Sequence, residues 1–294
     1  MKGRLHALIL RKLRAPRLAH HQTPASLGLH AQTLRLPVAD GKTLFAWFIP
    51  APGPACAPAV LVLHGWGANA GLMLDEVPQL HQSGFAVLLI DARCHGNSDE
   101  EDFTSLPRFA QDIDAGLDFL QAQAGVDRKK VAVIGHSVGA AAALLCATRR
   151  TDIAAVVSVS AFAHPAEVMR RLLRQYHVPY PVVGSYVLRH VQRVIGTSFD
   201  AIAPVSTIAH ARCPVLLVHG IQDQLVPIED ARRLLAAGRA GTVRLLEVPG
   251  GHDPRKAFKA HLSEVIDFLR GGDRRWLCGA GADLNDRSLP HHSS

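Results

Sequence analysis

The stretch Val131-Ala-Val-Ile-Gly-His-Ser-Val-Gly-Ala-Ala-Ala-Ala-Leu-Leu145 decides the fold. Its aliphatic residues predict a buried strand, and the small residues after the turn Gly135-His-Ser-Val-Gly139 predict a helix. A Gly-x-Ser-x-Gly turn holds its serine in a strained backbone conformation, and its neighbours must be small because strand and helix almost touch there. Such a turn directs Ser137 Oγ towards a base and a substrate carbonyl. Taken alone, the five-residue pattern also fits an ordinary glycine-rich connection.

Predicted strands and helices alternate on both sides of this turn. Two segments flank Asp40-Gly41, which is a hairpin signal. Continuous Val/Leu/Ile runs separated by helical patterns are typical of a parallel sheet covered on both faces. We expect strands at residues 33–38, 43–49, 59–63, 86–90, 130–134, 153–159, 214–218 and 243–248, and helices at 71–83, 107–123, 138–147, 228–238 and 254–269. The pattern predicts one α/β domain, at residues 33–270.

An insertion at about residues 162–205 interrupts the alternation and contains all three tyrosines. It has two helix-like patterns, and the second places Val183, Val187, Val191 and Ile195 on one face. We predict a helical cap that lines a pocket. The alternative is a pair of helices packed on the sheet edge.

Composition and charge exclude several classes of function. The 294 residues are 48% hydrophobic and 19% charged, so the chain buries a core and is not disordered. The net charge of +7 comes from the first 39 residues, which hold seven Lys/Arg and no acid, because the remainder has 25 basic and 25 acidic residues. A near-neutral body argues against nucleic-acid binding.

The two ends of the chain have their own patterns. Residues 1–32 form a basic extension, in which 1–20 are weakly amphipathic and are expected to make a weak peripheral contact with an anionic membrane. The alternatives are a first helix packed on the domain or a frayed end. Without a convincing cleavage site, we do not interpret this end as a secretory signal. Residues 271–294, rich in Gly, Asp and Arg, are predicted to be disordered.

The cysteines and paired histidines do not indicate a metal site. The five cysteines are odd in number and lack CxxC spacing, which fits a reducing compartment and a cytoplasmic location; they are Cys56, Cys94, Cys146, Cys213 and Cys278. His20-His21 and His291-His292 lack metal-ligand spacing and are interpreted as bystanders. No metal or organic cofactor is expected.

Three further loops complete a catalytic pattern around Ser137. A nucleophilic serine needs a base, a carboxylate that orients the base, and N–H donors for the oxyanion. In a parallel sheet these groups belong in loops at the carboxyl ends of strands. The loop Leu63-His-Gly-Trp-Gly67 supplies Trp66 N–H, which with Val138 N–H forms the candidate oxyanion pair.

The candidate acid and base follow later strands. Asp223 lies in the loop after 214–218, and His252 lies in a Gly-rich loop after 243–248. Each loop alone has an ordinary interpretation, as a turn, a helix cap or a solvated histidine. Four elements in the order oxyanion loop, Ser, Asp and His, each after its own strand, predict a Ser137–His252–Asp223 triad.

From about residue 33 to 270 the chain resembles an α/β-hydrolase-fold serine hydrolase. The resemblance implies a mostly parallel eight-stranded sheet, with Ser137 as nucleophile, Asp223 as acid and His252 as base. The loop Asp91-Ala-Arg-Cys-His-Gly-Asn-Ser98 is similar to the Asp-x-Arg-Gly-His-Gly-x-Ser loop of the branch with serine aminopeptidase-like and monoacylglycerol lipase-like members. We expect Asp91 and Arg93 to fix that turn, and Cys94 departs from the usual Gly.

The function we expect is ester hydrolysis through an acyl-enzyme on Ser137, as in an esterase or lipase-like hydrolase of small-molecule acyl substrates. A peptidase of the prolyl-oligopeptidase-like or aminopeptidase-like kind is the second hypothesis. A thioesterase or acyltransferase would share every catalytic residue. From another class comes a receptor that only binds ligands in the same pocket.

Overall fold

A computed structural model describes residues 14–53, 56–253 and 259–271. The described strands form one eight-stranded sheet in the order β1-β2-β4-β3-β5-β6-β7-β8. Strand β2 is antiparallel to both of its neighbours, and all other neighbouring pairs are parallel. The strands are β1 (Gln32–Pro37), β2 (Thr43–Ile49), β3 (Ala57–Leu63), β4 (Ala86–Ile90), β5 (Val126–His136), β6 (Ala155–Val159), β7 (Val215–Gly220) and β8 (Val243–Val248). The predicted mostly parallel sheet and its hairpin are confirmed.

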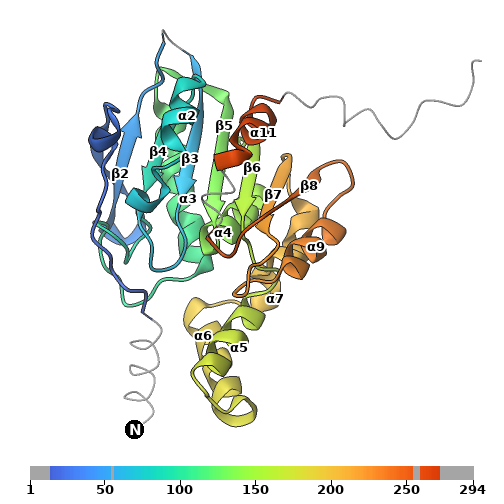
Figure 1. Cartoon of the computed structure of the whole chain (residues 1–294). Coiled ribbons are helices and arrows are strands. Elements are labelled where there is room, and N and C mark those ends of the chain that lie inside the picture. Colours follow the sequence, from blue (N-terminus) through green and yellow to red (C-terminus); the bar gives the residue numbers. More distant parts are fainter. Residues whose placement is uncertain (1–13, 54–55, 254–258, 272–294) are drawn as a thin grey trace, which may run out of the picture.

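Helices cover both faces of the sheet (Figure 1). One apolar cluster joins it to α3 (Leu106–Ala122), α4 (Val138–Arg149) and α9 (Ile228–Ala237). A second cluster, on the opposite face, includes residues of α2 (Val77–Gln82) and α11 (Leu262–Leu269). The aliphatic residues of β3 to β7 are buried on both faces, which is why these strands read as continuous rather than alternating apolar runs.

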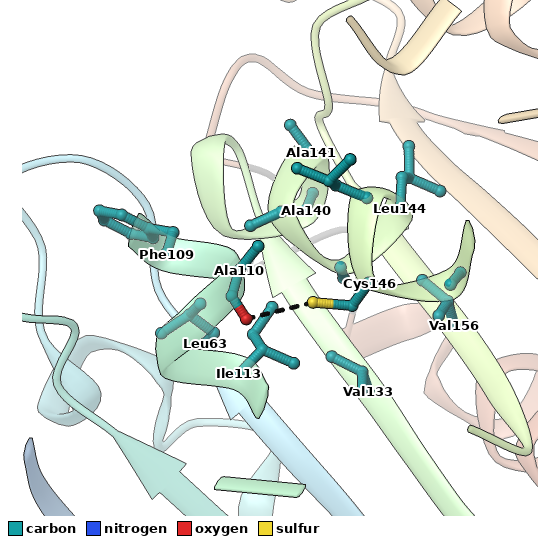
Figure 2. Close-up of a cluster of buried hydrophobic side chains, with 14 of the residues drawn as sticks. Leu63, Phe109, Ala110, Ile113, Val133, Ala140, Ala141, Leu144, Cys146 and Val156 are labelled. Carbon is teal, nitrogen blue, oxygen red and sulfur yellow. Dashed lines mark hydrogen bonds between the residues drawn. The ribbon is translucent and has the colours of Figure 1, made fainter. Parts of the chain in front are cut away.

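The helix after Ser137, α4, packs against α3 with mostly small side chains. Figure 2 shows Ala140 and Ala141 beside α3, and Cys146 Sγ donates a hydrogen bond of 3.3 Å to the carbonyl oxygen of Ala110. Burial raises the pKa of Cys146 to about 12, so this thiol is inert and serves packing. The tight α3–α4 layer fixes the start of α4, and with it the turn that carries Ser137.

Some predicted element bounds are wrong. The helix expected over 71–83 is a short turn, η3 (Ala70–Met73), followed by α2. Pro78 lies in the first turn of α2, where its missing N–H costs least, so the helix begins there instead of continuing from η3. Strand β5 begins at Val126, before the expected 130, and within the last expected helix the structure describes α11 (Leu262–Leu269). Residues 254–258 and the predicted disordered tail from 272 lie outside the described residues.

The insertion between β6 and β7 is helical. It contains α5 (Pro165–Gln175), η4 (Tyr180–Gly184), α6 (Ser185–Ile195), α7 (Phe199–Ile202), α8 (Pro204–Thr207) and η5 (Ile208–His210). Figure 1 shows α5 and α6 as a lobe that projects beyond the end of the sheet where β5 meets α4. Phe199 and Ile202 are buried and return the chain to the main core.

The described part of the N-terminal extension, residues 14–31, lies against the domain. Asn69 Nδ2 donates to the carbonyl oxygens of Leu18 and Ala19 at 2.9 and 3.1 Å, and Pro24 is buried. The membrane contact expected of residues 1–20 falls mostly on 1–13, outside the described residues. Within the ranges that are described, no helix is long and apolar enough to cross a bilayer.

Candidate active site

Ser137 occupies a strained turn between β5 and α4, as its glycine pattern predicts. Its φ is +53°, a left-handed value that is rare for residues other than glycine. A Cβ atom on Gly139 would lie 2.5 Å from the carbonyl oxygen of His64, and one on Gly135 would clash with the Gly139 backbone. Both positions therefore require glycine. The strain is stored where a nucleophile needs to stand clear of its own backbone.

The structure brings Ser137, His252 and Asp223 together, from three loops far apart in sequence. His252 Nε2 lies 3.0 Å from Ser137 Oγ, and His252 Nδ1 lies 2.8 Å from Asp223 Oδ2. The network assigns the proton on the imidazole to Nδ1, which donates to the carboxylate, so that Nε2 can accept from the hydroxyl. This is the arrangement in which an imidazole can remove a serine proton.

Asp223 is held as a carboxylate by its own loop. Its Oδ1 accepts hydrogen bonds from the Leu225 and Val226 amides at 2.9 and 2.8 Å. Burial acts to raise the pKa of Asp223, but the hydrogen bonds from His252 and Val226 outweigh it and keep that pKa below the ordinary value. His219 lies below the loop, and its Nε2–H donates to the carbonyl oxygen of Val226 at 2.8 Å. The carboxylate is thus ionised and fixed before substrate arrives.

The loop that carries His252 is pinned by contacts that the sequence did not reveal. His136 Nε2 donates to the carbonyl oxygen of His252 at 2.9 Å. Burial is the main reason that the pKa of His136 is lowered to about 4, so the ring stays neutral. A Cβ atom on Gly220 would lie 2.5 Å from the carbonyl oxygens of Gly250 and Gly251. The only sequence signal for His136 is its place inside the Gly-x-Ser-x-Gly turn.

The candidate oxyanion loop lies beside the nucleophile. A Cβ atom on Gly65 would lie 3.1 Å from Ser137 Cβ, so the backbone that leads into Trp66 passes next to the serine. Val138, the other candidate donor, is the first residue of α4, where backbone N–H groups have no partner within the helix. The Trp66 indole is 43% exposed and stacks on Phe109 at a centroid distance of 6.3 Å.

Two buried histidines support this loop from below. His64 Nδ1 donates to the Gly65 carbonyl oxygen at 2.7 Å, and His95 Nε2 accepts from the Gly67 amide at 3.0 Å. Burial and the neighbouring His95 lower the pKa of His64 to about 3. Both rings therefore act as neutral hydrogen-bonding struts rather than as acids or bases.

The Asp91 loop has the structural role expected of it. Asp91 accepts from the Ala70 and Asn97 amides at 2.7 Å each, and Arg93 Nε donates to Asp112 Oδ1 at 2.7 Å. Cys94 has a φ of +66°, the left-handed value that explains why glycine is usual at this position. Burial raises the pKa of its thiol, which disfavours a thiolate nucleophile.

The interpretation of His20 as a bystander is wrong. Its Nε2 lies 3.1 Å from Asp91 Oδ1, and its ring packs against Phe45 and Trp47 with centroid distances of 5.1 and 4.6 Å. A histidine in a polar, irregular segment gives no sequence pattern that would reveal such a contact. Among the residues that are described, no group of three or more His, Cys, Asp and Glu side chains is arranged to hold a metal ion.

Known proteins resemble this chain in both sequence and fold. Residues 55–203 match the family described as "Serine aminopeptidase, S33". A Mycobacterium tuberculosis protein described as uncharacterized is 32% identical over 232 residues, which cover 79% of this chain and 75% of that protein. The α/β hydrolase domain-containing protein WAV2 of Arabidopsis thaliana is 27% identical over 261 residues, covering 86% and 79%.

Solved structures share the fold at low sequence identity. An esterase of Pyrococcus furiosus superposes with a TM-score of 0.71 at 21% identity, over 90% of this chain and 97% of that one. Acetyl xylan esterase 1 of a Thermoanaerobacterium species gives 0.66 at 17% identity, over 90% and 92%. With the sheet order and the family match, these likenesses establish the α/β-hydrolase fold. The chain belongs to the serine aminopeptidase S33 family of α/β hydrolases.

Proposed function

We propose that this protein is a serine hydrolase that cleaves carboxylic ester bonds of small-molecule acyl substrates through an acyl-enzyme on Ser137. The observation that carries the proposal is the continuous relay of hydrogen bonds, 3.0 Å from Ser137 Oγ to His252 Nε2 and 2.8 Å from His252 Nδ1 to Asp223. The strained serine and the ionised, fully buried carboxylate support it, because both are features of an activated nucleophile.

In the first half-reaction Ser137 Oγ attacks the carbonyl carbon while its proton passes to His252 Nε2. Negative charge moves onto the carbonyl oxygen, where the amides of Trp66 and Val138 donate hydrogen bonds, each worth about 3–4 kcal/mol in the transition state. The bond to the alcohol then breaks, and His252 Nε2–H protonates the departing oxygen. Asp223 stabilises the imidazolium throughout and does not itself take the proton.

In the second half-reaction a water molecule replaces the alcohol. His252 removes a proton from the water, the resulting hydroxide attacks the acyl carbon, and collapse of the second tetrahedral intermediate returns the proton to Ser137. Apart from the water that is consumed, every group in these steps belongs to this chain. In this proposal the α5–α6 lobe acts as the cap of the site, which is supported by its place in the chain: it follows β6, whose last residue, Val159, accepts the Ser137 N–H at 2.8 Å.

The family description and the esterases of similar fold point to different bonds. A peptidase would use the same triad, and so would a thioesterase or acyltransferase, since each begins with attack of the same serine on an acyl carbon. We favour esters because the Ser137–His252–Asp223 relay is sufficient to expel an alcohol as the leaving group. A peptidase acting on free amino termini would also need carboxylates placed to hold the substrate amine.

The first test is covalent labelling with a fluorophosphonate, read by intact mass. Wild type should gain one adduct, and Ser137→Ala should gain none. Ser160→Ala is the matched control, because Ser160 also ends a strand at positive φ (+55°) but is fully buried; it should label like wild type. Labelling of Ser137→Ala at the wild-type rate would contradict the proposal.

The second test compares leaving groups at a fixed acyl chain. Nitrophenyl esters, acyl thioesters and aminoacyl anilides should be assayed side by side, with kcat/KM as the readout. The proposal expects the highest value for an ester. A higher value for the aminoacyl anilide would replace it with the peptidase hypothesis, whereas labelling without any turnover would indicate a ligand receptor.

A further inference from the structure

Exposed apolar side chains gather at the outer end of the α5–α6 lobe. We call Leu172, Tyr176, Val182 and Val183 the tip patch. Their exposed fractions are 37%, 79%, 75% and 46%, and they make up four of the nine large apolar side chains that are exposed among the described residues. The connection between α5 and α6 lies at the end of the lobe farthest from the sheet (Figure 1). Apolar exposure so concentrated marks a contact surface.

The tip patch is separate from the apolar side by which the lobe packs on the domain. Leu173, Val187 and Leu188 form the inner side of α5 and α6, and each is less than one tenth exposed. At the turn between the helices, a Cβ atom on Gly184 would lie 2.7 Å from the Tyr180 ring and 3.5 Å from the Leu173 side chain, so the turn packs closely on the inner side of the lobe. The lobe therefore has a complete inner core and a separate apolar outer surface.

The lobe that bears the tip patch carries more arginines than carboxylates. Residues 165–195 hold five arginines and one acid, Glu167. Glu167 is drawn towards the body of the protein by Arg233, at 2.7 Å, and one of the five arginines, Arg171, pairs with Asp230 at 3.0 Å. Arg174, Arg189 and Arg193 are exposed, and within the described ranges none of them makes an ion pair with a side chain. Arg170 lies over the Tyr180 ring at 5.3 Å.

We infer that the tip patch docks on an anionic lipid surface. Valine and tyrosine side chains would enter the region between head groups and acyl chains, where tyrosine is favoured, and the arginines of the lobe would meet lipid phosphates. A second copy of the chain fits this surface poorly, because docking like lobes would bring two sets of arginines together. The inference is independent of the proposed hydrolysis and concerns only binding.

Sedimentation of the full chain with lipid vesicles tests the inference. Vesicles of phosphatidylcholine alone should bind weakly, and vesicles with an equal share of phosphatidylglycerol should bind strongly, with binding that falls as salt rises. The double variant Val182→Asp, Val183→Asp should lose about tenfold in partition coefficient, since two apolar contacts are replaced by charges that the lipid repels. Its matched control is Leu235→Asp, which alters an exposed apolar residue on α9 and should bind like wild type.

A second pair of variants isolates the charges. Arg189→Gln with Arg193→Gln should weaken binding to the anionic vesicles, whereas Arg128→Gln with Lys129→Gln removes the same charge from an exposed site outside the lobe and should not. Thermal unfolding of each variant verifies its fold. Deletion of residues 1–13 separates any binding by the basic N-terminus from binding by the lobe.

Two results would overturn the inference. One is equal binding of wild type and the Val182→Asp, Val183→Asp variant to anionic vesicles in the background that lacks residues 1–13. The other is absence of vesicle binding together with a concentration-dependent dimer that this variant abolishes, which would assign the tip patch to self-association. Ester hydrolysis is unaffected by either outcome, so the two proposals fail separately.

Discussion

Two Asp–His pairs lie at the same end of the sheet and are built differently. Asp223 meets His252 at 2.8 Å, and Asp91 meets His20 at 3.0 Å. Both carboxylates are fully buried and accept two backbone amides each. In both, hydrogen bonds hold the pKa of the carboxyl below its ordinary value against burial, which acts to raise it.

The difference lies at the far nitrogen of each imidazole. His252 Nε2 faces the hydroxyl of Ser137, whereas His20 Nδ1 lies 3.2 Å from the amide nitrogen of Asn97. A hydroxyl that loses its proton becomes a nucleophile, but a side-chain amide does not. The His20 side chain is also only 7% exposed, against 22% for His252. An Asp–His pair can therefore act as a base only when a hydroxyl faces the far imidazole nitrogen and solvent or substrate can reach it. Otherwise the pair is a structural clamp that holds two segments together.

The largest expected effect comes from Asp223→Asn. The asparagine amide would favour the imidazole tautomer that cannot accept the serine proton, so kcat should fall about 10⁴-fold. The free energy of unfolding should change much less than the activation free energy of hydrolysis, since the loop amides keep an oxygen acceptor. Steady-state ester hydrolysis measures the first quantity and urea unfolding the second. A loss of activity of about tenfold or less would show that Asp223 does not orient the base.

Asp91→Asn should give the reverse pattern. It places an amide NH₂ against one of the backbone donors from Ala70 and Asn97, and it removes the charge that His20 contacts. We expect the free energy of unfolding to fall by about 3 kcal/mol, because buried donors are left without an acceptor. Activity per folded molecule, with the folded fraction taken from circular dichroism, should stay within about tenfold of wild type. A 10⁴-fold loss, as expected for Asp223→Asn, would erase the distinction between the two pairs.

His64 sharpens the comparison, because it is an imidazole beside this site that donates to a backbone carbonyl instead of a carboxylate. Its pKa is lowered to about 3, so the unfolded chain, with an ordinary value of about 6.5, binds the proton first as pH falls. The stability that it contributes is complete above about pH 6.5 and is lost on acidification. Between pH 7 and pH 5 this loss should amount to about 2 kcal/mol.

His64→Gln tests this pH dependence. Glutamine cannot take up a proton, so the difference in unfolding free energy between pH 7 and pH 5 should be smaller in the variant by about 2 kcal/mol, whatever its stability at pH 7. Urea unfolding of wild type and of the variant, each at pH 7 and at pH 5, supplies the four free energies that this comparison needs. An unchanged difference would mean that His64 is protonated in the folded protein or titrates alike in both states.

The fold and the proximity of three candidate site residues could both be predicted from the sequence, for a clear physical reason. Strands β3, β4, β6 and β7 and residues 131–135 of β5 are largely buried on both faces, so their aliphatic runs are unbroken, and parallel strands bring the loops that follow them to one edge. Ser137 and Asp223 follow β5 and β7, and His252 follows the edge strand β8, which is parallel to β7. Their proximity follows from topology alone, while their catalytic roles remain predictions until the variants are measured.

The contacts that could not be predicted from the sequence are made by side chains that are far apart in the chain and are brought together only by the tertiary fold. His136 reaches a carbonyl oxygen more than one hundred residues away, and His20 reaches Asp91 from an irregular segment. His136 is the last residue of β5 and His20 lies outside any helix or strand, but neither has a partner at a fixed sequence spacing, so no pattern predicts these contacts. The break between η3 and α2 was missed because the apolar spacing of 71–83 continues through Pro78.

The smallest expected effect, and the most direct test of the clamp, comes from His20→Phe. Phenylalanine keeps the ring that packs on Phe45 and Trp47 but cannot donate to Asp91, which retains its two backbone donors. The free energy of unfolding should therefore fall by about 1.5 kcal/mol, the low end for a hydrogen bond to a charged group, and kcat should change by less than about twofold. His21→Phe is the matched control, because His21 is an exposed neighbour, and it should alter neither quantity. If His20→Phe instead reduced kcat while leaving stability unchanged, the Asp91–His20 pair would belong to the chemistry, and the contrast between a relay and a clamp would be wrong.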